Sequence, residues 1–342
     1  MPQSFLDFRS DTVTRPTPAM RNAMYEAEVG DDVFGDDPTV IRLQERVADL
    51  LGKEKALLVP SGTMANQIAV NCHTKPGDEI YSHVGSHLVN YEGGAAAMLS
   101  GVMIATIESG RGSFSAKDVE DRLRPADHHF APSRLIWVEN SHNRSGGTIF
   151  PQANVPALRD LADRNHLAMH LDGARLWNVA VATGEKEIDL ASEFDTVSCC
   201  LSKGLGCPVG SLIAGSAEFI DKAHQARKRF GGGMRQAGFL AAAGLYALEN
   251  HRARLADDHT RARRIAEAVA NLRSLRIDME SVQTNIVLFD AAPRQGVEVA
   301  DHLKEQGLLV TSFGSRIRMV CHLDVDDAAV EQAIVILRKT FA

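Results

Sequence analysis

From about residue 38 onward, short apolar segments alternate with helical or polar ones, and this alternation limits the possible folds more than any other feature. Asp37 and Pro38 predict the start of a helix that Gly52 ends. Strands that alternate with helices are typical of an α/β domain with a largely parallel sheet. The strand candidates are residues 56–60, 79–81, 102–106, 135–139, 167–171, 196–201 and 211–214.

The pattern changes near residue 240. A helical stretch from 239 to about 272 carries many charged residues, which we expect to form a solvated face. Two strand-like segments follow, 285–289 and 316–321, with a helix between them and a last helix over 327–339. We therefore predict an N-terminal segment and large domain over residues 1–247, and a small C-terminal α+β domain over residues 248–342.

Composition and charge exclude several classes of protein. The chain has 342 residues, 44% of them apolar and 24% charged, which is ordinary for a soluble globular protein. A net charge of −7 gives no indication of nucleic-acid binding. Without a long apolar run or a secretory signal, we expect no membrane association and a cytoplasmic location. The five cysteines have no CxxC spacing and predict reduced thiols.

The strongest chemical candidate is Lys203, which follows the apolar segment 196–201 and precedes two glycines. By itself it could simply mark the exit of a strand onto the surface. Asp172 ends the segment 167–171, and ligands of open α/β sheets gather outside the carboxyl ends of the strands. An amine and an acid at this edge suit pyridoxal phosphate, whose aldehyde binds a lysine and whose ring nitrogen pairs with a carboxylate. For Asp172 followed by glycine, a plain turn is the alternative.

Three further motifs are weaker. The sequence 61–63 (Ser-Gly-Thr) lies between a strand and a helix, where backbone N–H groups bind phosphate or a side chain simply caps the helix. Arg235 follows three glycines, which indicates that the backbone there approaches a phosphate or another subunit. The acidic stretch 30–37 lacks the order of a calcium-binding loop, and His128 and His129 lack a zinc spacing, so we predict no metal.

Several motifs in the same order make the chain resemble the low-specificity L-threonine aldolases over nearly its whole length. They are residues 6–16, 29–38, 61–66, 139–143, 172–175, 202–206 and 231–236. The resemblance implies a pyridoxal-phosphate enzyme of fold type I, with a transferase-like large domain and a small C-terminal domain. It also implies a homotetramer, built as a dimer of dimers.

The resemblance assigns roles to individual residues. It implies that Lys203 holds the cofactor aldehyde and that Asp172 pairs with the ring nitrogen. Gly62 and Thr63 then bind the phosphate, together with Arg235 from the same or a neighbouring subunit. The residues for the amino-acid carboxylate are Ser10, Arg175 and Arg318, and Arg175 also belongs to the cofactor site. His87 matches an imidazole stacked on the cofactor ring, and His129 matches a second histidine near the substrate hydroxyl.

The implied reaction is retro-aldol cleavage of L-threonine, L-allo-threonine or a related β-hydroxy-α-amino acid to glycine and an aldehyde. The base for the β-hydroxyl proton is His87, His129 or a water held by either, since histidine titrates near neutral pH. Another fold type I reaction, β-elimination or transamination, and a non-catalytic homologue are the alternatives. The preference between the two β-diastereomers stays open, because residues 88–91 and 144–147 depart from some relatives.

Overall fold

Seven strands form one large sheet in the order β2-β8-β7-β6-β5-β3-β4 in the computed structural model, which describes residues 5–341. Only β8 runs in the direction opposite to the other six strands, so the predicted, largely parallel α/β sheet is confirmed. Each strand overlaps one of the predicted segments. The strands are β2 (Lys55–Val59), β3 (Glu79–His83), β4 (Met103–Ile107), β5 (Ser133–Glu139), β6 (Ala168–Gly173), β7 (Thr196–Cys200) and β8 (Ser211–Gly215).

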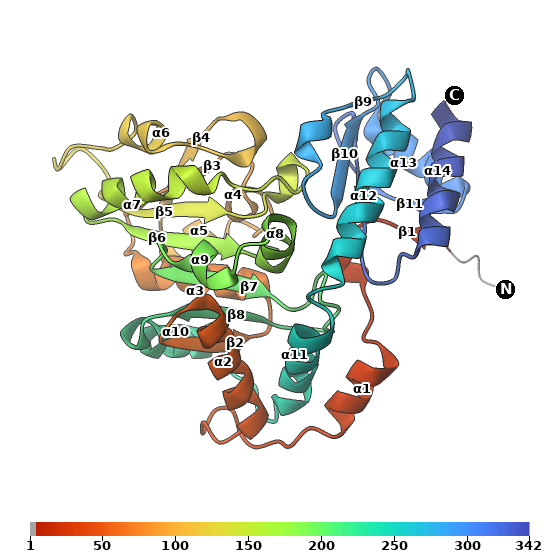
Figure 1. Ribbon diagram of the computed structural model, residues 1–342. Helices are drawn as coiled ribbons and strands as arrows, with labels where there is room; N and C mark the ends of the chain where they lie inside the picture. The colour runs from red at the N-terminus through yellow and green to blue at the C-terminus, as the bar shows by residue number, and fades with distance from the viewer. Residues whose placement is uncertain (1–4, 342) are drawn as a thin grey trace.

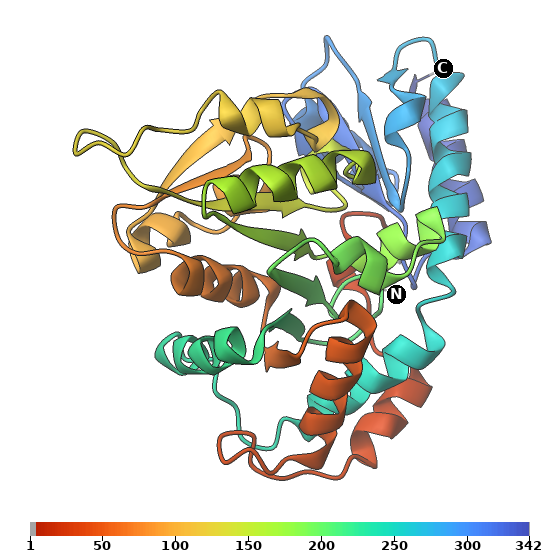
Figure 2. The same ribbon diagram turned by 60° about the vertical axis from the view of Figure 1, so that its left-hand side comes forward.

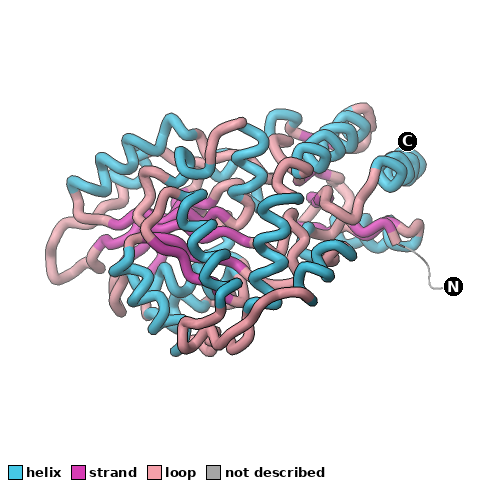
Figure 3. Tube along the Cα trace, turned by 60° about the horizontal axis from the view of Figure 1, so that its bottom comes forward, coloured by secondary structure: helices cyan, strands magenta, loops and turns pink. Residues whose placement is uncertain are grey.

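Helices cover both faces of this sheet, as Figure 3 shows. Alternate residues of β2 divide between two buried clusters: Ala56 and Leu58 belong to one, Leu57 and Val59 to the other. Burial on both faces explains why the strands read as continuous apolar runs. The longer helices around the sheet are α2 (Pro38–Leu51), α3 (Gly62–His73), α7 (Val155–Arg164), α8 (Leu176–Thr183), α10 (Ala217–Arg229) and α11 (Gly238–Asn250).

The helix predicted after Asp37 is α2. The Asp37 carboxylate accepts hydrogen bonds from the backbone N–H of Thr39 and Val40, and Gly52 ends the helix with a φ of 61°. The other helices of this part of the chain are α1 (Pro18–Tyr25), α4 (His87–Asn90), α5 (Ala95–Ser100), α6 (Ala116–Glu120) and α9 (Glu187–Ala191). Single 3-10 turns are η1 (Asp11–Val13), η2 (Gly110–Gly112), η3 (Asn143–Ser145), η4 (Gln152–Asn154) and η5 (Met279–Ser281).

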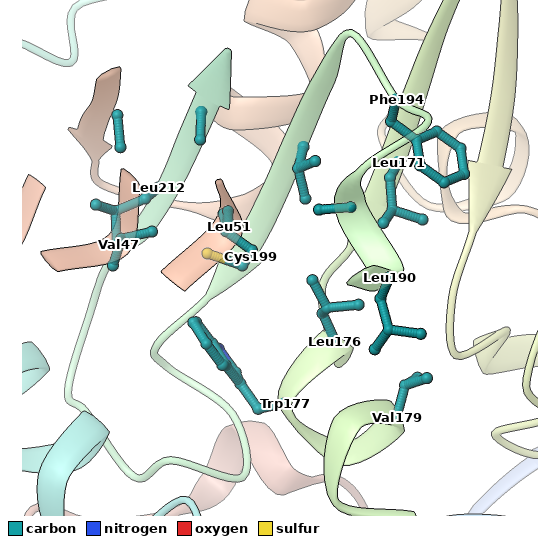
Figure 4. Packing of buried hydrophobic residues seen from close by; sticks show 14 of the residues in the cluster. Val47, Leu51, Leu171, Leu176, Trp177, Val179, Leu190, Phe194, Cys199 and Leu212 are labelled. Atoms are coloured by element: carbon teal, nitrogen blue, oxygen red, sulfur yellow. The ribbon is translucent and has the colours of Figure 1, made fainter. Parts of the chain in front are cut away.

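One packed region fixes the ends of β6 and β7, the two strands that lead to Asp172 and Lys203. Trp177 of α8 lies beside Cys199 of β7, and its indole N–H donates to the Cys200 carbonyl oxygen at 3.0 Å (Figure 4). Cys199 belongs to this core, whereas Cys200 points to the opposite face of the strand. All five cysteines are free thiols, as predicted.

A second, smaller unit contains a four-stranded antiparallel sheet in the order β12-β13-β10-β9 (blue in Figure 1). The predicted strands 285–289 and 316–321 are β10 and β13. The strands are β9 (Arg276–Ile277), β10 (Ile286–Asp290), β12 (Thr311–Phe313) and β13 (Arg316–Val320). The helices beside them are α12 (Leu255–Ala270), α13 (Gly296–Glu305) and α14 (Asp327–Phe341).

The N-terminal segment also packs on this smaller unit. Strand β1 (Leu6–Asp7) pairs in parallel with β11 (Leu308–Leu309), and Phe8 is buried in the same cluster as Phe289 and Ile317. Figure 2 shows the red N-terminal segment lying between the two units. The division between residues 247 and 248 stays a prediction, because the chain's first described residues contribute to the smaller core.

The long helix predicted over 239–272 is instead two helices, α11 and α12, separated by a turn over residues 251–254. The His251 side chain is buried at this break, and its Nδ1 lies 2.8 Å from the Leu205 carbonyl oxygen. Leu205 belongs to the loop that carries Lys203, so the break between the helices allows a tertiary contact. A pattern of apolar residues along the sequence cannot predict such a contact. Among helices of the described residues, none is both long and apolar enough to cross a membrane.

Candidate active site

A cavity of about 180 Å³ lies where the carboxyl ends of β5, β6 and β7 meet the amino end of α3. Six of the predicted site residues line it: Gly62, Thr63, His87, Asp172, Arg175 and Lys203. A larger cleft of about 510 Å³ between α2 and α10 contains none of them. The structure therefore brings together, in one small cavity, residues that are up to 141 positions apart in the sequence.

The amino end of α3 supplies an anion-binding wall. Ser61 caps the helix by accepting a hydrogen bond from the Met64 backbone N–H at 3.2 Å. The unpaired N–H groups of a helix's first turn, together with the helix dipole, favour a bound phosphate. Position 62 requires glycine because the Cys200 side chain lies close to it: a Cβ atom there would lie 2.8 Å from the Cys200 Sγ. The Cys200 side chain thus packs directly against this end of the helix.

Asp172 presents a buried carboxylate to the cavity. Its Oδ2 accepts a hydrogen bond from Asn66 Nδ2 at 2.9 Å, and its Oδ1 accepts one from the Ala174 N–H at 3.1 Å. Burial raises the pKa of Asp172, and the nearby negative charge of Glu139 raises it further. A cationic N–H group in the cavity would lower the pKa of Asp172 and so oppose both effects. A protonated pyridine nitrogen is such a group.

Lys203 lies in the loop between β7 and β8, half-buried at the same edge of the sheet. Its carbonyl oxygen accepts a hydrogen bond from Thr14 Oγ1 at 3.0 Å. The two glycines after Lys203 have structural reasons. Gly206 has a φ of 79°, which favours glycine, and a Cβ atom at Gly204 would lie 2.9 Å from the Leu255 side chain. The geometry of this loop therefore accounts for both glycines that follow Lys203.

His87, at the start of α4, lies on a third side of the cavity. Its Nδ1 is 2.8 Å from Glu92 Oε1, and its backbone N–H donates to Glu139 Oε2 at 2.6 Å. Burial by itself lowers the pKa of His87, but the hydrogen bond to Glu92 and the charge of Asp172 outweigh it and raise the pKa above its ordinary value.

Arg175 and Arg318 form a cationic corner next to the cavity. Arg175 is buried and donates from Nε and Nη2 to the two carboxylate oxygens of Asp11, both at 2.7 Å. Arg318 of β13 donates from Nη2 to Asn143 Oδ1 at 3.0 Å, and its buried Nε has no hydrogen-bond partner in residues 5–341. Burial lowers the pKa of Arg318 to about 10, and Arg175 contributes to this shift. Arg318 therefore keeps a buried N–H without a partner among the described residues and does not itself line the cavity, whereas Arg175 lines it and is largely committed to Asp11.

Ser10 lies beside this corner and is not among the residues that line the cavity. Its Oγ accepts hydrogen bonds from the Thr12 N–H at 3.2 Å and from Thr12 Oγ1 at 2.9 Å. The Ser10 hydroxyl itself donates to Asp11 Oδ1 at 3.5 Å. Its part in substrate binding stays a prediction.

His129 and Arg235 are not brought to the cavity of their own chain. His129 lies in an exposed loop before β5 and contacts Asp127. Glu139, which lines the cavity, stands at the other end of β5, and the seven residues of that strand span about 20 Å. Figures 1 and 2 show this loop protruding at the far left. The Arg235 side chain is 57% exposed and pairs with Asp31. Within one chain, only His87 of the two candidate bases faces the cavity.

Five residues that sequence reasoning did not assign complete the site: Asp11, Asn66, Glu92, Glu139 and Asn143. Glu139 could have been found, because it ends a predicted strand at the same edge as Asp172. Asp11, Asn66 and Asn143 stand inside the motifs that carry the family resemblance. Glu92 is five positions after His87, and no motif singled it out.

Solved structures of low sequence identity share the fold of this chain. A threonine aldolase from Leishmania major superposes with a TM-score of 0.83, covering 98% of this chain and 99% of that chain at 18% identity. A putative aromatic amino acid beta-eliminating lyase/threonine aldolase from Exiguobacterium superposes with a TM-score of 0.79 over 99% of both chains at 19% identity. At such low identity the likeness concerns the fold, and it defines fold type I of the pyridoxal-phosphate enzymes.

Sequence comparison then fixes the family. The beta-eliminating lyase family model matches residues 7–292, so the chain belongs to that family. A probable low-specificity L-threonine aldolase of Arabidopsis thaliana is 42% identical over 98% of this chain and 97% of its own length. The low specificity L-threonine aldolase of Escherichia coli K12 is 40% identical over 94% of both chains.

Proposed function

We propose that the chain is a pyridoxal-phosphate-dependent L-threonine aldolase of low specificity, a carbon–carbon lyase. It cleaves L-threonine, L-allo-threonine and related β-hydroxy-α-amino acids to glycine and an aldehyde. The observation that carries the proposal is the convergence of Lys203, Asp172, His87 and the amino end of α3 on one cavity. Identity of about 40% to curated threonine aldolases over nearly the whole chain supports the same reaction.

The residues of the cavity fit pyridoxal phosphate. The Lys203 amine would hold the aldehyde carbon, the amino end of α3 at Gly62 and Thr63 would hold the phosphate, and the buried Asp172 would pair with the ring nitrogen. When bound, the cofactor supplies an electron sink for the bond that breaks at Cα. The guanidinium of Arg318, beside Asn143 at the edge of the cavity, would bind the substrate carboxylate and so orient the Cα–Cβ bond.

His87 is the proposed base in this mechanism. Its Nδ1 is engaged by Glu92, which leaves Nε2 to take the proton of the β-hydroxyl. Loss of that proton and cleavage of the Cα–Cβ bond release the aldehyde, and protonation at Cα then gives glycine. Asp172 and Arg175 are buried, which would limit the access of water to the charges that orient the substrate.

Product analysis tests the proposed function. We expect the purified holoenzyme to convert both L-threonine and L-allo-threonine to acetaldehyde and glycine in equal amounts. Release of ammonia and a 2-keto acid would instead indicate β-elimination. The ratio of turnover between the two diastereomers measures the β-carbon preference, which the sequence leaves open.

Gly62→Ala is expected to weaken cofactor binding. The added methyl group would lie 2.8 Å from Cys200 Sγ, so either the helix end or the strand must move, and the phosphate contacts move with it. We expect the dissociation constant for pyridoxal phosphate to rise about tenfold, since overpacking of this kind costs about 1–3 kcal/mol. Gly110→Ala is the matched control, because nothing lies within 4 Å of its added Cβ. Equal affinity in both variants would contradict the assignment.

We further propose a cytoplasmic homotetramer in which Arg235 completes the phosphate site of a neighbouring copy. The exposed guanidinium of Arg235 lies outside its own chain's cavity, and Lys203 is the only lysine among the residues that line that cavity. His129 is exposed in its protruding loop, and we propose that it too approaches the site of a neighbouring copy. Five free thiols are consistent with a reducing compartment. Sedimentation analysis of the holoenzyme and of Arg235→Ala tests the assembly.

A further inference from the structure

The Glu92 carboxylate is fully buried beside the cavity but does not line it. It accepts three hydrogen bonds, from His87 Nδ1 at 2.8 Å, Asn66 Nδ2 at 2.7 Å and Gln67 Nε2 at 2.6 Å. An ionised carboxylate has only acceptors, and these three short contacts satisfy it without a protein cation. Burying a carboxylate costs free energy unless its hydrogen-bond partners stay in place. The side chains around Glu92 are therefore held in one arrangement.

Asn66 links Glu92 to the acid that faces the cofactor site. Its Nδ2 donates one hydrogen to Glu92 Oε1 and the other to Asp172 Oδ2, at 2.7 and 2.9 Å. Its Oδ1 accepts from Ser198 Oγ at 2.9 Å, which fixes the orientation of the amide. His87, Glu92, Asn66 and Asp172 therefore form one continuous chain of hydrogen bonds behind the cavity.

We propose that Glu92 is a positioning residue that keeps the His87 proton on Nδ1 and presents Nε2 to the cavity as the basic atom. This inference rests on the proposed function, since it assigns the proton acceptor of the same reaction. Histidine has two ring nitrogens, and the partner of one decides which form the other takes. Glu92 acts through His87 and through Asn66 and does not touch the substrate.

The groups that face His87 come from several elements. They are Glu92 and Tyr91 just after α4, Glu139 at the end of β5, Asp172 at the end of β6 and Lys203 after β7. Of these, Glu92 alone bonds to the imidazole, and the negative charges outnumber the one cation. Removal of the Glu92 charge must therefore shift the His87 titration to lower pH.

The Glu92→Gln variant tests the effect of the Glu92 charge separately from its hydrogen bonds, because Gln67 can adapt to the new side chain. The Gln67 Oε1 is buried without a hydrogen-bond partner in residues 5–341. If the substituted amide keeps its oxygen toward His87 and Asn66, its nitrogen faces Gln67, whose own side-chain amide can turn over and accept. The variant thus retains the hydrogen-bond geometry and removes only the charge, whereas Glu92→Ala removes both.

Nitrogen-15 NMR of histidine-labelled, cofactor-free protein tests the proposal without any turnover, with His87→Asn to assign the signal. In the wild type we expect the proton on Nδ1. In Glu92→Gln we expect the same form with its titration shifted to lower pH, and in Glu92→Ala a mixture of both ring forms. Asn90→Ala is the control: it removes hydrogen bonds from the same segment to the carbonyl oxygens of Val84 and Ser86 and leaves the imidazole untouched. An unshifted titration in Glu92→Gln, or the same shift in Asn90→Ala, would overturn the proposal.

The kinetics of the holoenzyme give a second readout. We expect Glu92→Gln to move the acid limb of the kcat profile to lower pH and to reduce the plateau by about tenfold, with KM for L-threonine nearly unchanged, because a weaker base remains in place. Loss of activity by the same factor at every pH would indicate a merely structural role and contradict the proposal. A shifted NMR titration in a protein that releases no aldehyde would refute the proposed function and leave the positioning by Glu92 intact.

Discussion

Lys203→Ala is expected to abolish the visible absorbance of the covalently bound cofactor and to reduce aldehyde release by more than about 10⁴-fold, the scale seen when a covalent group is removed. Lys203 supplies the only primary amine among the residues that line the cavity. Pyridoxal phosphate can still bind through its phosphate and ring nitrogen, so the variant should retain the cofactor without the covalent band. Absorbance spectra before and after borohydride reduction, together with acetaldehyde assays, measure both effects.

Lys53→Ala provides the control for this variant. Lys53 is also a partly buried lysine, and it donates to the Phe194 carbonyl oxygen on the far side of the large unit from the cavity. The Lys53→Ala variant should keep the absorbance band. It therefore separates the general effect of losing a partly buried lysine from the loss of the proposed reactive amine. Full aldolase turnover by Lys203→Ala would show that the central assignment of this site is wrong.

The parts of the site that the sequence could predict are those set by local pattern. Lys203 and Asp172 follow apolar segments, and parallel strands necessarily place their carboxyl ends along one edge of the sheet. The same reasoning locates Gly62 and Thr63, since a strand followed at once by a helix puts free N–H groups at that edge. The helix after Asp37 was equally predictable, because its cap and its terminal glycine are adjacent to it in sequence.

The remaining parts depend on contacts between distant segments. Asp11 and Arg175 are 164 positions apart, and Asn143 and Arg318 are 175 apart, so no spacing within a motif indicates either contact. Strands β1, β9 and β11 have two residues each, too short to show an alternating pattern. The direction of Arg318 does follow from local pattern, because it alternates with Ile317 and Met319 of the small core and so points away from that core.

Asp11→Asn is expected to destabilise the folded protein by about 3–5 kcal/mol, the usual cost of leaving one buried charge without its partner. Both carboxylate oxygens of Asp11 bind Arg175 at 2.7 Å, and Asn285 Nδ2 adds a third contact at 3.2 Å. The asparagine would leave the buried Arg175 without a counterion. Urea midpoints of matched holoenzymes measure the loss, and the Asp7→Asn variant is the control, because the Asp7–Arg9 pair lies at the surface and contributes at most about 1 kcal/mol.

The pH dependence of this difference distinguishes a charge effect from a packing defect. Burial opposes ionisation of Asp11, but Arg175 outweighs it and holds the pKa of Asp11 well below its ordinary value. A carboxyl group with a depressed folded pKa stabilises the protein fully above its unfolded pKa of about 3.9, and this contribution is lost as pH falls further. The two chains should therefore differ by a constant amount from pH 7 to about pH 5 and converge below about pH 4. A gap that persists unchanged into acid would mean that asparagine disturbs packing and that the ion pair contributes little. Convergence would establish that this buried pair, which also holds Arg175 at the cavity, acts through its charge.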